Sequence, residues 1–135
     1  MADSNSQSQR PLSPHLQIYR PMLTMMMSIV HRMTGAALYF GTLLLIWWLV
    51  ALATGPEYFA YVQDIAGSFL GRLVLFGYTW ALIHHAIGGI RHLIWDTGRG
   101  FDLDGVEWMA RLNLAGSIVL TIVIWVIGYQ AMGGL

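Results

Sequence analysis

The stretch MTGAALYFGTLLLIWWLVALATGP, from Met33 to Pro56, contains no Asp, Glu, Lys or Arg. Two further runs of the sequence share this property, Leu73–Ile90 and Leu112–Leu135. A helix needs about 20 apolar residues to cross the roughly 30 Å hydrocarbon core of a bilayer. The sequence therefore predicts an all-α membrane protein with three transmembrane helices, of which the second is the shortest.

The amino-acid composition also indicates that the chain lies in a lipid bilayer. Of 135 residues, 56% are hydrophobic and 10% are charged, whereas soluble domains carry about 25% charged residues. The formal net charge is zero, so nothing indicates a nucleic-acid partner. Cysteine is absent, which excludes cysteine-ligated iron–sulfur clusters and covalently attached c-type haem on this chain.

These runs divide the chain into a polar N-terminal segment, 1–23, and a three-helix anchor domain, 24–135. The expected spans cover about 26–54, 68–95 and 109–133. The pair Gly55-Pro56 is a helix terminator, and the connection that follows it is expected to carry a short interfacial helix. We expect the second helix to continue past Arg91, with the guanidinium snorkelling to the interface.

Arginine, the basic residue type of this chain, predicts the orientation. Three spans put six arginines on the side of the N-terminus and leave Arg72 alone on the other. Because the positive side is normally cytoplasmic, we expect the N-terminus inside and the C-terminus outside. The N-terminal segment lacks the pattern of a signal or transit peptide, which favours a bacterial inner membrane over a mitochondrial one. The six are Arg10, Arg20, Arg32, Arg91, Arg99 and Arg111.

Three histidines lie in the second span, in ALIHHAIGGIRHLIWD, Ala81–Asp96. His85 and His92 are seven residues apart, so they share a helix face, while His84 points about 100° away. Ionisable groups inside a membrane are costly and usually mark a functional site, and neutral imidazole is a common axial ligand of haem iron. The spacing leaves two interpretations open, a cofactor ligand and a role in packing or proton transfer.

A haem with two axial ligands needs a second donor. We expect His31 to lie near the water boundary, so the chain offers no second histidine at the depth of the three in the second span. Three helices also enclose a macrocycle poorly. In a haem site the iron would therefore be five-coordinate, or a second ligand would come from another chain, and both points predict a partner subunit within a larger helical bundle.

The segment SIVHRMTG, Ser28–Gly35, begins the first span. Ser28 and Arg32 are one helical turn apart and lie on nearly the same face. Together they can hold the carbonyl oxygens of a quinone and stabilise charge as it is reduced, while His31 or a water delivers protons. The alternative is that Arg32 snorkels to the interface and contributes only to orientation.

Three segments in this order resemble the motifs of the cytochrome b anchor subunits of succinate dehydrogenase. They are RPLSPHLQIYRP from Arg10, SIVHRMTG from Ser28 and HHAIGGIRHLIWDTG from His84. The resemblance covers nearly the whole chain. It implies a subunit of respiratory complex II that passes electrons from succinate oxidation to quinone, linking the tricarboxylic acid cycle to electron transport.

The resemblance also implies site residues. The family pattern H-x3-G-x2-H places the axial ligand of the haem b iron on His85 rather than His84. Ser28 and Arg32 would line the ubiquinone pocket, and no residue of the chain would be catalytic. The residues expected near the haem propionates are His31, Arg91 and His92.

Partners follow from the same resemblance. FAD and the iron–sulfur clusters would belong to a flavoprotein subunit and an iron–sulfur subunit. A second small membrane anchor would share the haem. Two alternatives stay open: the anchor of a quinol:fumarate reductase, and a non-redox membrane assembly or transport subunit.

Overall fold

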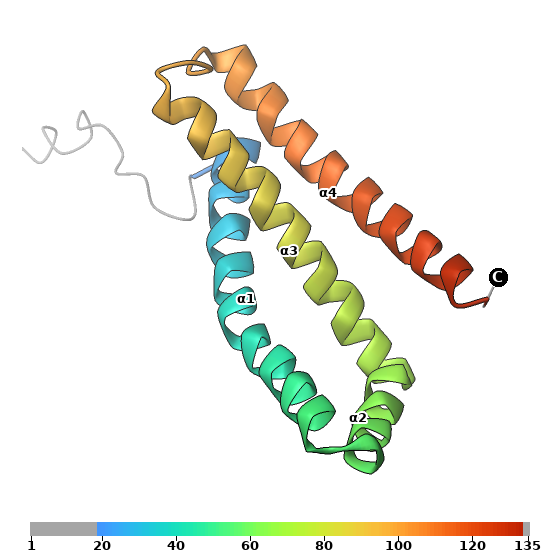
Figure 1. Ribbon diagram of the computed structural model, residues 1–135. Coiled ribbons are helices and arrows are strands. Elements are labelled where there is room, and N and C mark those ends of the chain that lie inside the picture. The colour runs from blue at the N-terminus through green and yellow to red at the C-terminus, as the bar shows by residue number, and fades with distance from the viewer. Residues whose placement is uncertain (1–18, 134–135) are drawn as a thin grey trace, which may run out of the picture.

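The computed structural model describes residues 19–133, and in that range the chain forms four helices (Figure 1). They are α1 (Leu23–Thr54), α2 (Pro56–Gly67), α3 (Phe69–Asp96) and α4 (Leu103–Ala131). The three long helices are long and apolar enough to cross a membrane, and α3 is the shortest of them, as predicted. Most of the N-terminal segment, including the motif up to residue 18, lies outside the described residues.

The connection after α1 contains the predicted short helix, α2. Gly55 separates the two helices with φ 142°, a conformation that a side chain would disfavour, and Pro56 begins α2. The indole of Trp47 donates a hydrogen bond to Tyr58 Oη at 2.9 Å. The indole of Trp48 donates to Gln63 Oε1 at 3.3 Å, so two bonds attach α2 to the end of α1.

At the other end, α3 continues past Arg91 to Asp96, as predicted. The fourth helix begins at Leu103, earlier than the apolar run suggested, because Asp102 caps it by accepting the Gly105 N–H at 2.7 Å. The start of α1, the end of α3 and the start of α4 therefore lie at one end of the molecule (Figure 1). The end of α1, α2, the start of α3 and the end of α4 lie at the opposite end.

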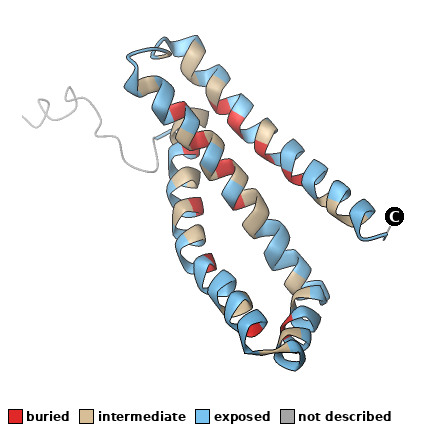
Figure 2. Ribbon diagram, in the orientation of Figure 1, coloured by how far each residue is buried: buried red, intermediate tan, exposed pale blue. Residues whose placement is uncertain are grey.

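Burial in this chain is the reverse of that in a soluble protein. Within residues 19–133 the buried side chains are mostly small or polar, and they line the faces where the long helices meet (Figure 2). Large aliphatic and aromatic side chains cover the outside, among them Phe40, Leu43 and Ile127. Membrane helices associate through small residues and interhelical hydrogen bonds, because lipid already solvates apolar side chains. The buried polar residues are Thr34, His84, Arg91, Asn113, Ser117 and Thr121.

Gly41 allows α1 to approach α3. A Cβ at this position would lie 3.0 Å from Tyr78 Cζ and closer still to two other ring atoms. We expect Gly41→Val to destabilise the protein by about 1–3 kcal/mol, the usual cost of overpacking, and to lower its thermal midpoint in detergent. Gly77→Val is the matched control, since a Cβ there meets no atom within 4 Å. An equal loss in both variants would contradict this account.

Candidate functional site

The predicted site begins with three histidines from α1 and α3. The rings of His31 and His85 stack with centroids 4.0 Å apart and planes 6° from parallel. The ring of His92 lies 5.3 Å from that of His31. The prediction that His85 and His92 share a face is thus confirmed, because both lie beside the same α1 residue.

The same stack corrects one expectation. His31 lies at the depth of His85, not apart from it near the water boundary. The ring of His31 fits against α3 because residue 88 is a glycine. A Cβ at Gly88 would overlap His31 Nδ1. Rings stacked face to face at this distance cannot hold a macrocycle between them. The stacked pair therefore offers no position between its rings for a macrocycle.

The ring of His85 is oriented by α1. Its Nδ1–H donates to the backbone carbonyl of His31 at 3.1 Å, with Thr34 Oγ1 nearby at 3.4 Å. Gly35 makes this approach possible, since a Cβ there would lie 2.9 Å from His85 Cε1. With the proton on Nδ1, a neutral ring presents a lone pair on Nε2. This nitrogen has no hydrogen-bond partner among the described residues. A metal-binding histidine usually bonds through its other nitrogen in this way.

The side chain of His84 packs against α4, whereas that of His85 packs against α1. His84 is fully buried between α3 and α4, where its ring lies 5.0 Å from that of Trp80. Its Nδ1 is 3.2 Å from Ser117 Oγ. The single hydroxyl proton of Ser117 goes to the Leu114 carbonyl at 2.9 Å, so His84 is the donor to Ser117. The Nε2 of His84 is enclosed, and a macrocycle could reach it only if the two helices separated.

Arg91 lies on the face of His84, and it does not snorkel as expected. Its side chain is 3% exposed because it folds back over Trp95, with its guanidinium carbon 4.9 Å from the ring centroid. Its Nε and Nη2 atoms are buried without a partner in residues 19–133. Buried guanidinium donors of this kind match an anionic group supplied from outside the chain.

Ser28 and Arg32 line a shallow cavity of about 450 Å³ where α1 begins and α3 ends. Both residues are exposed, and Arg32 Nε donates to the Ser28 carbonyl at 3.3 Å. Trp95 forms part of the wall and also contacts His92, with ring centroids 5.1 Å apart. The cavity and the histidine cluster are thus neighbours, as the sequence indicated. The lining residues are Thr24, Met25, Ser28, Ile29, Arg32 and Trp95.

Sequence reasoning missed two parts of this arrangement. It gave no site role to Trp95, which links Arg91 to the cavity. It also overlooked Asn113, Ser117 and Thr121, a buried polar row on α4. Their regular spacing of four residues within a nearly uncharged segment was the available signal. The amide of Asn113 lies close to His31, since a Cβ at Gly88 would be 3.3 Å from Asn113 Nδ2.

This chain is similar to known proteins over most of its length. Residues 6–124 match the family described as succinate dehydrogenase/fumarate reductase transmembrane subunit. The succinate dehydrogenase cytochrome b556 subunit of Paracoccus denitrificans is 44% identical over 122 residues, which cover 90% of this chain and 93% of the relative. That of Rickettsia conorii is 37% identical, with 88% and 93% covered. The mitochondrial cytochrome b560 subunit of Sus scrofa is 38% identical, with 96% and 75% covered. This chain belongs to the family of succinate dehydrogenase/fumarate reductase transmembrane subunits.

Proposed function

We propose that this chain is the cytochrome b anchor of a succinate dehydrogenase, and that it holds haem b through His85 and ubiquinone at Ser28 and Arg32. The orientation of His85 carries the proposal. Its Nδ1–H is fixed by the His31 carbonyl, which leaves Nε2 as the iron ligand, whereas the ring of His84 is sealed between α3 and α4. The relatives named above are succinate dehydrogenase subunits, which favours succinate oxidation over fumarate reduction.

The residues around His85 fit a haem. Haem b held by His85 would supply a one-electron redox centre, and a second small anchor subunit would share it. Arg91 carries buried donors without partners, which suits a propionate. His31 has an unpartnered Nδ1, and His92 lies on the same side, so both are assigned to the propionate region.

The cavity beside these residues suits the head of ubiquinone. The guanidinium of Arg32 is exposed there and keeps a permanent positive charge. Such a charge stabilises the negative charge that develops on a quinone oxygen during reduction. Ser28 adds a hydroxyl on the same wall, and His31, next to Arg32 in the chain, is the group that passes protons.

The rest of the reaction lies on other chains. A flavoprotein subunit and an iron–sulfur subunit oxidise succinate and deliver electrons, and this chain anchors them to the membrane. The arginine distribution supports a cytoplasmic N-terminus, and we assign the chain to a bacterial inner membrane. The site then lies near the cytoplasmic face, where the soluble subunits dock.

A difference spectrum tests the proposed function. The complex is purified through a tag on this chain, and its dithionite-reduced minus oxidised spectrum is recorded. We expect a b-type band together with co-purification of three further subunits. A tagged chain that purifies without a b-type band and without succinate-oxidising subunits would be a non-redox membrane protein, and the proposal would be wrong.

A further inference from the structure

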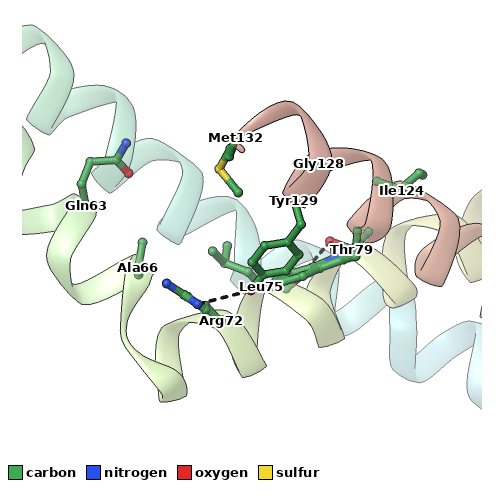
Figure 3. Close-up of a pocket in the computed structure, with 11 residues that line it drawn as sticks. Gln63, Ala66, Arg72, Leu75, Thr79, Ile124, Gly128, Tyr129 and Met132 are labelled. Carbon is green, nitrogen blue, oxygen red and sulfur yellow. Dashed lines mark hydrogen bonds between the residues drawn. The ribbon is translucent and has the colours of Figure 1, made fainter. Parts of the chain in front are cut away.

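A second cavity lies at the opposite end of the molecule from the histidine cluster, between α2, α3 and α4 (Figure 3). Its volume is about 550 Å³, within the range of roughly 300–1,000 Å³ typical of ligand pockets. Arg72 and Tyr129 lie side by side in its wall, joined by a hydrogen bond. The lining residues are Gln63, Ala66, Gly67, Arg72, Leu75, Thr79, Ile124, Trp125, Gly128, Tyr129 and Met132.

Arg72 is the only arginine between Arg32 and Arg91, and the chain contains no lysine. Its Nη1 donates to Tyr129 Oη at 3.4 Å, and its guanidinium carbon is 5.9 Å from the centre of that ring. It pairs with no carboxylate, since the one ion pair within residues 19–133 joins Arg111 to Glu107. A guanidinium has five N–H donors, so most of those of Arg72 are available to an anion.

The cavity continues from Arg72 along an apolar wall. From Arg72 to Thr79 the helix rises about 10 Å, which carries the cavity from the headgroup level toward the hydrocarbon core. Leu75 and Ile124 line this deeper part of the cavity. The polar groups at its deep end are satisfied by each other, because Trp125 Nε1 donates to Thr79 Oγ1 at 3.2 Å.

We propose that this cavity binds one anionic phospholipid, with its phosphate on Arg72 and Tyr129 and an acyl chain against Leu75 and Ile124. The charged end of the cavity matches the phosphate of a phospholipid, and the apolar wall matches its acyl chain. None of the eleven lining residues is Asp or Glu, so the ammonium of a zwitterionic headgroup finds no counterion. The site is independent of haem and quinone, so either assignment can fail without the other.

Two substitutions address the two halves of the site. Gly128→Leu places a larger side chain in the wall of the cavity, and its Cβ meets no atom within 4 Å. Arg72→Gln removes the charge and keeps the length of a polar side chain. Gly77→Leu is the matched control: it is equally open, lies on α3 and does not line the cavity.

Native mass spectrometry of the intact detergent-purified complex, titrated with phosphatidylglycerol, reads out the result. We expect one lipid retained by the wild type and by Gly77→Leu. Loss of a charge-assisted contact should weaken retention in Arg72→Gln by about tenfold or more, and Gly128→Leu should retain none. Inorganic phosphate should not displace the lipid, and phosphatidylcholine should be retained more weakly.

Four outcomes would overturn the proposal. Equal lipid retention in the wild type and Gly128→Leu would mean that the cavity is not the site. Displacement by inorganic phosphate would make the ligand a free anion, and equal retention of phosphatidylcholine would remove the charge selectivity. Failure of Gly128→Leu alone to assemble, with Gly77→Leu intact, would show that a helix of a partner subunit occupies the cavity.

Discussion

Replacement of His85 by alanine is expected to abolish the b-type absorbance band of the assembled complex. The variant loses the only imidazole among the described residues of α3 whose Nε2 is free while its Nδ1–H is fixed by a backbone carbonyl. We expect haem content per complex to fall at least tenfold, judged against the 10–100-fold losses seen when only a supporting group of a metal ligand is removed. Reduced-minus-oxidised spectra and pyridine haemochrome assays measure the loss.

His84→Ala is the matched comparison, one residue away. It leaves a void between α3 and α4 and removes the hydrogen bond to Ser117, so the complex should be less stable. The spectrum of the haem that remains should keep its position and its amount per complex. A normal band in His85→Ala with loss in His84→Ala would reverse the assignment of the ligand.

The second large effect concerns Arg32. We expect Arg32→Ala to lower quinone reductase activity about 100-fold, the scale on which removal of one charge-stabilising donor acts at a reaction centre. Ser28→Ala should have a smaller effect of the same kind, because a neutral hydroxyl contributes less than a cation. Dye-linked succinate oxidation should be unchanged in both, since that chemistry belongs to other subunits.

Arg99→Ala supplies the control for charge. Arg99 is exposed, follows the end of α3 at the same end of the molecule, and does not line the cavity of Ser28 and Arg32. It should therefore retain quinone reductase activity. Equal quinone turnover in the wild type and Arg32→Ala, or an equal loss in Arg99→Ala, would remove Arg32 from the quinone site.

The sequence was most informative about the long helices and one face of α3. Gaps between charged residues located the three helices, because an uncompensated charge at membrane depth is costly enough to be visible in a single sequence. Helical periodicity placed His85 and His92 together, and both do lie beside His31. Gly55-Pro56 marked the break before α2 for the local steric reasons that act at any helix end.

The sequence was less informative about which helix packs against which face of its neighbour. Periodicity separates His84 from His85 by direction but does not say which direction meets α4 and which meets α1. The burial of Arg91 involves its contact with Trp95, so it could not be distinguished from snorkelling by position alone. The cavity around Arg72 joins three helices, and its residues are far apart in the chain.

The buried polar row of α4 has a consequence for biogenesis. Acyl chains cannot replace the bond between His84 and Ser117, so once α3 and α4 meet in the bilayer their separation leaves polar groups facing hydrocarbon. We therefore expect α3 and α4 to stay paired once they have met. On the opposite face of α3, the bond from His85 to the His31 carbonyl uses a backbone acceptor of α1 and leaves Nε2 of His85 without a hydrogen-bond partner among the described residues.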